Sequence, residues 1–232
     1  MKRLTLILFV CASAMMLSAQ DYLGVQFGYA RPITRLNSVA SKTTLDVTAY
    51  NGLKVGLVYD ATIIKGFGVT MGLNYTFGAN NTDWMKKVNN QPAEYPKIRS
   101  KAQYHQLEIP IEWQYKFEIA KRTWIILYTG PTLQCGLAFK ESTYNQITSS
   151  GDITIDAKDR YNMKSVFALN RLNVTWGVGA GLQYERYFIR GGYDFGLINP
   201  YKSDVFNISD EYSPYTRGRF DQWQLKIGMY LF

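Results

Sequence analysis

The sequence is poor in the residues that build disulfides and transition-metal sites, with two cysteines and one histidine in 232 residues. Cys11 lies in a segment that we expect to be removed, which leaves Cys135 as the single thiol of the mature chain. One thiol cannot form an internal disulfide, and one cysteine with one histidine cannot complete a Cys/His zinc site. We therefore expect a fold held by hydrogen bonds and packing, with no metal and no cofactor.

Long apolar runs are also scarce, since mean hydropathy is −0.19 and the one sustained run lies in MKRLTLILFVCASAMMLSA. Lys2 and Arg3 precede that run and small residues follow it, which is typical of a secretory signal. We predict residues 1–19 as a signal peptide and residues 20–232 as one domain. Cleavage after Ala14, an uncleaved anchor and acylation of Cys11 are the alternatives.

What the sequence has instead is a repeated two-residue alternation. In the C-terminal QWQLKIGMYLF, Trp223, Leu225 and Ile227 take one side, and Gln224 and Lys226 take the other. This period predicts a strand with one apolar and one polar face. Seven earlier segments share the pattern: DYLGVQFGYARP, NGLKVGLVYD, GFGVTMGLNYTFG, QLEIPIEWQYKF, WIILYTGPTLQCGLAF, RLNVTWGVGAGLQYE and YFIRGGYDFGLIN.

The lengths of these segments and of their connections indicate a membrane barrel. Segments of about ten residues suit tilted strands that cross a bilayer. Long connections, at residues 32–48, 79–102, 140–170 and 199–217, alternate with the tight turns TIIKG, EIAKRT and YERY. We predict an all-β, eight-stranded antiparallel up-and-down transmembrane β-barrel with long extracellular loops and short periplasmic turns. The last strand would pair with the first, both termini would be periplasmic, and ITSSGDITID in the third long connection predicts a hairpin.

The polar face of these strands carries charge that must lie inside such a barrel. An eight-stranded barrel is only wide enough for side chains to fill, and buried charges are tolerated when paired. We predict a paired network that plugs the lumen, with Asp194 and Lys226 in direct contact, and Asp60 and Glu185 near the periplasmic rim. A wet lumen that forms a narrow passive channel is the alternative. The predicted network comprises Lys54, Glu108, Glu112, Lys116, Arg190, Asp194 and Lys226.

Several segments resemble the PorT-like family of small outer-membrane barrels of Bacteroidota. They are YHQLEIPIEWQYKF, YTGPTLQCGLAF, GLQYERYFIRGGYDFGLIN and the aromatic C-terminal end. The resemblance implies a location in the outer membrane of a Gram-negative cell and folding by the barrel-assembly machinery. Because the member that gives the family its name is linked to type IX secretion, it also implies an adaptor that serves as an accessory component of such a system.

The charge of the chain, +8 at pH 7, suggests surface partners. Basic residues of the second long connection would face a phosphorylated glycolipid, so we predict a lipopolysaccharide contact at Lys86, Lys87, Lys97, Arg99 and Lys101. Basic residues of the tight turns could dock periplasmic or outer-membrane secretion proteins, and these are Lys65, Lys121, Arg122 and Arg186. A signal peptide and membrane strands argue against nucleic acid as a partner.

Catalysis has weak support in the sequence. His105 is the single histidine, and no serine lies in its strand to act as a nucleophile; Ser100 in the adjoining connection is the nearest. The GVGAG segment at 177–181 is not followed by a helix that could bind phosphate, so its glycines indicate close packing in the lumen. We predict a non-enzymatic structural or adaptor protein, with a lipid A-modifying enzyme as the alternative.

Overall fold

The computed structural model describes residues 20–38, 44–83, 97–146, 152–162, 168–201 and 215–231. The predicted signal peptide lies outside these ranges. No helix among the described residues is long and apolar enough to cross a membrane. The strands are β1 (Gln20–Ser38), β2 (Thr44–Ala49), β3 (Asn51–Ile64), β4 (Phe67–Asp83), β5 (Lys97–Ala120), β6 (Thr123–Gln146), β7 (Asp152–Asp159), β8 (Leu172–Tyr184), β9 (Tyr187–Gly196) and β10 (Tyr215–Tyr230).

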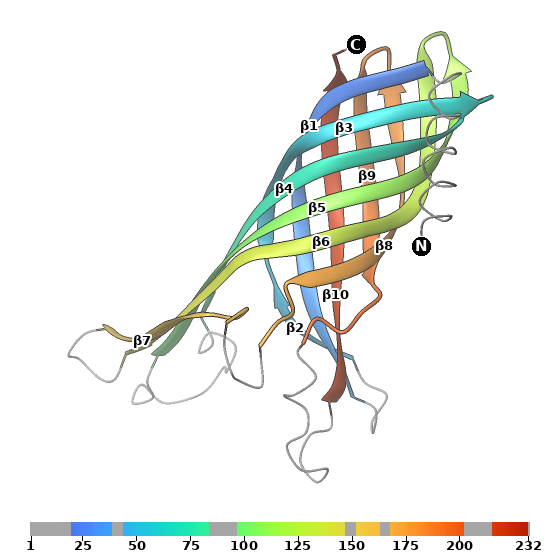
Figure 1. Cartoon of the computed structure of the whole chain (residues 1–232). Helices are drawn as coiled ribbons and strands as arrows, with labels where there is room; N and C mark the ends of the chain where they lie inside the picture. The colour runs from blue at the N-terminus through green and yellow to red at the C-terminus, as the bar shows by residue number, and fades with distance from the viewer. Residues whose placement is uncertain are drawn as a thin grey trace, which may run out of the picture.

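Eight of these strands close into an antiparallel ring, in the order β10-β9-β8-β6-β5-β4-β3-β1 (Figure 1). β10 completes the ring by pairing with β1, from Gly24 opposite Tyr230 to Ser38 opposite Tyr215. Every strand of the ring therefore has a hydrogen-bonded neighbour on both sides, as a bilayer requires. The predicted eight-stranded barrel is confirmed, and its last strand does pair with its first.

The strands run further than the sequence analysis predicted. β4 extends to Asp83 and β5 begins at Lys97, so much of the connection predicted at 79–102 is strand, and β5 and β6 each have 24 residues. β2 and β7 also lie in predicted connections and pair with β1 and β6. β7 forms the predicted hairpin with β6. These extensions need no apolar face, because ladder hydrogen bonds continue wherever neighbouring backbones stay adjacent.

Three tight turns join strands at the end of the barrel where β1 begins and β10 ends, here called the turn end; the opposite end is the loop end (Figure 1). Lys65 and Gly66 join β3 to β4 with φ of 43° and 87°, the two positive values of a type I′ turn. Arg122 and Glu185, with φ of 63° and 50°, lie in the β5–β6 and β8–β9 turns. The three predicted tight turns are confirmed.

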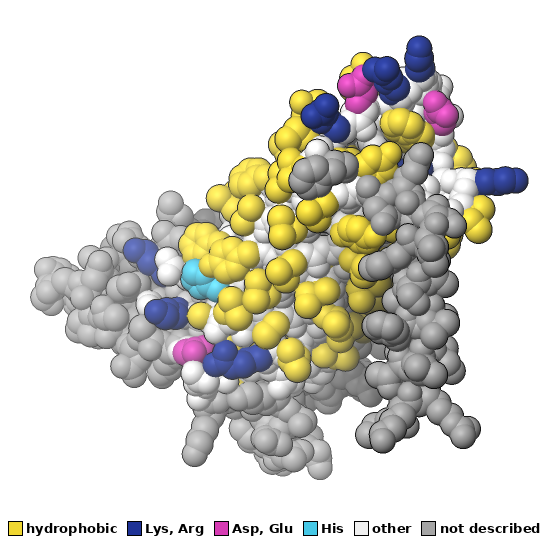
Figure 2. Space-filling view, turned by 45° about the horizontal axis from the view of Figure 1, so that its top comes forward, with side chains coloured by type: hydrophobic (Ala, Val, Ile, Leu, Met, Phe, Trp, Pro, Cys, Tyr) yellow, Lys and Arg dark blue, Asp and Glu magenta, His cyan; other side chains and the backbone are white. Residues whose placement is uncertain are grey.

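The two faces of each strand differ sharply in exposure. On β3, Leu53 and Val55 are 55% and 54% exposed, whereas Lys54 between them is 1% exposed. In Figure 2 the outward apolar side chains form a belt, with charged groups gathered at its two ends. The apolar faces point outward and the polar faces inward, which is the reverse of a soluble sandwich and is typical of a membrane barrel.

Candidate functional site

The interior of the barrel is filled by a column of charged and amide side chains, here called the lumen column. Four cations and four carboxylates take part, so their formal charges cancel. All seven residues of the predicted network lie in this column, and the structure adds Asp60 as an eighth charge. Amides and hydroxyls from neighbouring strands occupy the space between the charges.

Asp60 is the centre of the column near the turn end. Its Oδ2 lies 3.0 Å from Lys116 Nζ and 3.1 Å from Arg190 Nη2, and it accepts a hydrogen bond from the Tyr230 hydroxyl at 2.5 Å. Its Oδ1 accepts from Gln114 Nε2 at 2.5 Å. Asp60 lies four residues before Ile64, the last residue of β3 at the turn end, which agrees with the predicted position near that rim, and it is 0% exposed. Two aromatic residues, one of them Tyr230, lie beside Lys116 and cover this layer.

Toward the loop end the charges form two further groups. Lys226 Nζ and Arg190 Nη1 each lie 3.7 Å from a Glu112 oxygen. Lys54 Nζ lies 2.5 Å from Glu108 Oε2, and both of these side chains are 1% exposed. Charges that are buried this deeply are stable only when each has an opposite charge and hydrogen-bond partners.

The predicted direct pair between Asp194 and Lys226 is wrong. The β9–β10 register sets Asp194 opposite Gln222 and Lys226 opposite Arg190. Asp194 instead accepts hydrogen bonds from Gln224 Nε2 at 2.9 Å and from Gln222 Nε2 at 3.4 Å. Amide donors therefore satisfy this carboxylate in place of a cation.

The GVGAG glycines make room for the lumen column. A Cβ on Gly179 would overlap the ring of Tyr128, and one on Gly181 would lie 2.9 Å from Arg190 Cγ. Tyr128 in turn lies beside the Arg190 guanidinium, 5.8 Å from ring centroid to Cζ. The geometry agrees with the close packing predicted for these glycines.

An aromatic cluster covers the loop end of the column. Most of its ring pairs meet edge to face, as with Tyr50 and Phe139 at 5.5 Å and 89°. Burial raises the pKa of Tyr161 in this cluster to about 12, so its hydroxyl stays neutral over the physiological range. The sequence analysis missed the cluster because its members come from separate connections and strands: Tyr50, Ala102, Tyr104, Phe139, Tyr161, Leu169 and Tyr201.

A second group missed by the sequence analysis lies on the outward face near the loop end. Asp221 is 0% exposed, and its Oδ2 lies 3.0 Å from Arg35 Nη1 and 2.8 Å from Arg219 Nη2. The Tyr193 hydroxyl donates to the same oxygen at 3.0 Å, and the backbone N–H of Gly196 donates to Oδ1 at 2.9 Å. We call Arg35, Arg219 and Asp221 the seam cluster, because β1 and β10 meet there.

The basic residues predicted to dock partners are all exposed and all lie at the turn end. Arg122 pairs with Glu185 at 2.7 Å, and this hydrogen bond raises the pKa of the Arg122 guanidinium. A backbone bond from Glu185 N–H to the Arg122 carbonyl, at 2.9 Å, ties the two turns together. Hollows of about 480 and 440 Å³ lie beside these turns and share Tyr22 and Trp124.

The structure describes only some of the residues predicted to contact lipopolysaccharide. Lys86 and Lys87 lie outside the described residues. Lys97 and Arg99 belong to β5, where the structure describes their backbone, and Lys101 is exposed on the outward face of the same strand. His105, further along that face, has its Nδ1 hydrogen-bonded to the Tyr75 hydroxyl, and its ring packs against Phe77 at 5.1 Å.

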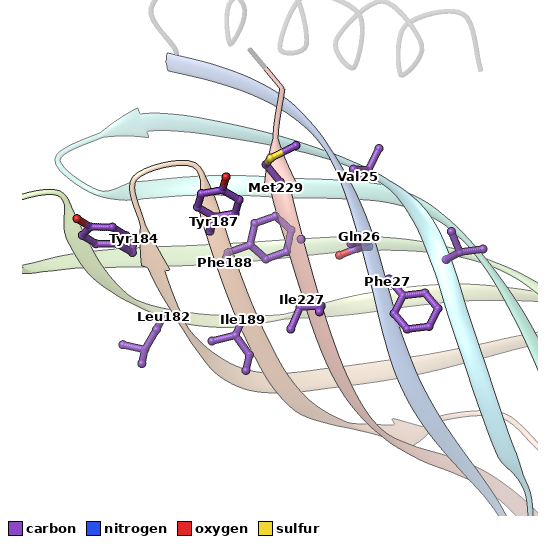
Figure 3. Close-up of a pocket in the computed structure, with 12 residues that line it drawn as sticks. Val25, Gln26, Phe27, Leu182, Tyr184, Tyr187, Phe188, Ile189, Ile227 and Met229 are labelled. Atoms are coloured by element: carbon purple, nitrogen blue, oxygen red, sulfur yellow. The ribbon is translucent and has the colours of Figure 1, made fainter.

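A hollow of about 670 Å³ lies where β10 meets β1, toward the turn end (Figure 3). Most of its lining is apolar and outward, including Phe27, Ile227 and Met229. It lies within the apolar belt, where lipid chains can fill it in a bilayer.

The described side chains contain no group of three or more His, Cys, Asp or Glu residues that could hold a metal ion.

Comparisons with known proteins give a family. The family described as "Outer membrane protein beta-barrel domain" matches residues 18–202. No curated protein matches the sequence significantly. Similar solved structures include Ail of Yersinia pestis in complex with the heparin analogue sucrose octasulfate, with 12% identity, a TM-score of 0.38, and coverage of 93% of this chain and 100% of Ail. Neisserial surface protein A has 12% identity, a TM-score of 0.39 and coverage of 89% and 96%.

The outer-membrane protease OmpT from Escherichia coli has 9% identity, a TM-score of 0.40, and coverage of 93% of this chain and 99% of OmpT. The closed strand ladder of this chain, and not these distant likenesses, establishes its architecture. The family match covers most of the chain and agrees with the apolar outward belt. This chain therefore belongs to the outer membrane protein beta-barrel domain family.

Proposed function

We propose that this outer-membrane protein is a non-conducting, non-enzymatic barrel that acts as a structural or adaptor protein. The observation that carries the proposal is the lumen column, which fills the barrel with neutralised charge from Asp60 and Lys116 to Lys54 and Glu108. An ion entering this space would have to displace buried pairs, each of which is costly to break.

Conductance tests this proposal. Purified protein inserted into a planar lipid bilayer should give no steady single-channel current. A steady current in the wild-type protein would refute the plug and favour the narrow passive channel. Insertion needs an independent check, which is faster migration of the unboiled protein on a gel, and fractionation of native cells should recover the protein with the outer membrane.

The proposed orientation sets the turn end in the periplasm and the loop end outside. Periplasmic or outer-membrane secretion proteins would then dock on Lys65, Lys121, Arg122 and Arg186, and the resemblance to PorT-like barrels supports an accessory role in type IX secretion. The barrel-assembly machinery would fold the chain. An affinity pull-down from native membranes tests the docking, with a variant that changes Lys65 and Lys121 to glutamine as the matched control; equal recovery of partners with this variant would argue against docking at these turns.

Outside the cell, Lys101 and its neighbours Lys86, Lys87, Lys97 and Arg99 would contact lipopolysaccharide. His105 would act as an interfacial residue and not as a catalytic base, because Tyr75 and Phe77 already engage its ring. Catalysis on lipid A would require an oriented nucleophile within hydrogen-bond reach of such a base.

A further inference from the structure

We infer that the seam cluster is a phosphate-binding site for a phosphorylated glycolipid of the outer leaflet. The inference rests on the proposed orientation, which places the loop end outside. It concerns residues other than the loop and strand cations assigned above to lipopolysaccharide. The ligand group is a phosphate monoester at the level where the apolar belt ends.

The backbone register brings two arginines together on one face. Arg35 of β1 lies directly opposite Arg219 of β10. Like charges in this position destabilise a pair of strands. Asp221 lies between the two guanidinium groups and contacts both, at 3.0 and 2.8 Å. Asp46 of β2 also lies opposite Arg35 in the ladder.

Asp221 holds the arginines in place. Its Oδ2 receives three donors, from Arg35, Arg219 and Tyr193, and its Oδ1 receives the backbone N–H of Gly196. The carboxylate is 0% exposed, whereas the Arg35 and Arg219 side chains are 25% and 36% exposed. The outward parts of two planar guanidinium groups are thus positioned in advance, the arrangement that suits a phosphate.

The site lies at the border of the apolar belt. On the same outward face of β10, Leu225 and Ile227 are 45% and 55% exposed and would face lipid chains. Tyr29 and Trp223 pack against each other between these residues and the cluster, at 5.1 Å. Arg31, exposed and opposite Trp223, adds a third cation to this face. A ligand whose acyl chains lie toward the turn end and whose phosphate lies toward the loop end matches this order of apolar, aromatic and cationic groups.

Binding of purified lipid A to the refolded protein in detergent micelles tests the inference. Wild-type protein should bind bisphosphorylated lipid A, and changing Arg35 and Arg219 to glutamine should weaken binding about 30-fold, since each cation near an anionic surface contributes about 1 kcal/mol. Changing Arg122 and Arg186 to glutamine removes the same charge at the turn end and should alter binding less than about two-fold. Equal loss in both variants, or equal binding of dephosphorylated lipid A, would overturn the inference.

Asp221→Asn separates a built site from diffuse attraction. This change makes the surface more positive, so diffuse attraction would strengthen lipid A binding. A built site should instead bind more weakly, because the arginines lose the group that positions them. Gel mobility of the unboiled protein confirms that each variant is folded, and tighter or unchanged binding by Asp221→Asn would refute the site.

Orientation is measured separately, so that its failure can be told from failure of the site. Gln103→Cys in a Cys135→Ser background should react with a membrane-impermeant maleimide in intact cells, because Gln103 is exposed at the loop end. No labelling together with lipid A binding in micelles would refute the proposed orientation and the outer-leaflet source of the ligand. Labelling without phosphate-dependent binding would refute the phosphate site alone.

Discussion

Removing the ammonium group of Lys54 should destabilise the barrel strongly. Lys54 Nζ lies 2.5 Å from Glu108 Oε2 and 2.6 Å from Gln224 Oε1, and its side chain is 1% exposed. Lys54→Met keeps most of the apolar stem but leaves the Glu108 carboxylate without a cation. Removing one member of a buried ion pair typically costs about 3–5 kcal/mol, so we expect a loss of that size in the free energy of unfolding.

The double variant Lys54→Met with Glu108→Gln should lose less stability than Lys54→Met alone. It removes both charges, and Thr76 can still donate its hydrogen bond to the glutamine carbonyl as it does to Glu108 Oε1 at 2.8 Å. Replacing a buried pair by neutral groups is often close to neutral for stability, so we expect a loss of about 1–2 kcal/mol. Lys65→Met in the exposed turn is the matched control and should change stability by about 0.5 kcal/mol or less.

Urea unfolding of the protein refolded into lipid vesicles measures these differences. Tryptophan fluorescence and the gel mobility of the unboiled protein should give coincident transitions, which shows that a two-state analysis is valid. If Lys54→Met behaves like Lys65→Met, water must solvate Glu108 in the lumen. That outcome would refute the paired plug and revive the wet channel.

Three further predictions concern the faces of the strands, the packing of the lumen and the absence of catalysis. Val178→Arg sets a charge on the lipid face and should cost about 2–4 kcal/mol near the bilayer midplane, while Gln183→Arg on the lumen face should cost less; equal losses in urea unfolding would mean that the faces are misassigned. Gly179→Val should overlap Tyr128 and lower stability by about 1–3 kcal/mol, and an unchanged urea midpoint would contradict the packing described for that glycine. His105→Ala should leave the acylation of lipid A in the native host unchanged by mass spectrometry, and an altered pattern would support the enzyme.

The faces of the strands could be predicted from the sequence because the backbone sets a side-chain period of two residues. Parity alone predicts that Lys54 and Lys226 face the lumen, and both are at most 2% exposed. Strand ends were less predictable, since β5 continues through polar residues from Lys97 that share a ladder with β4 and β6. The apolar belt marks where the membrane lies and not where hydrogen bonding stops.

Height along the barrel could not be read from parity. Asp194 and Lys226 share a face and lie on neighbouring strands, but the register separates Gln222, the partner of Asp194, from Lys226 by four positions. That separation is about 13 Å along a strand, so Asp194 and Lys226 lie at different heights and do not contact each other directly. The complete burial of Asp60 could not be predicted either, because it depends on residues from three other strands that only the closed ring brings together.

Carboxylates and cations are paired at successive heights along the lumen, and this arrangement determines how the plug could open. Asp60 is balanced by Lys116 and Arg190, Glu112 by Lys226 and Arg190, and Glu108 by Lys54, so each of these carboxylates has at least one cation at its own height. Asp194, held by two amides, is the exception. Arg190 contacts both Asp60 and Glu112, so removing it should disturb two levels. Removing Lys54 should disturb one level and leave the others paired. A conducting path would need every level to open at once, so single charge variants should lower stability without producing steady conductance.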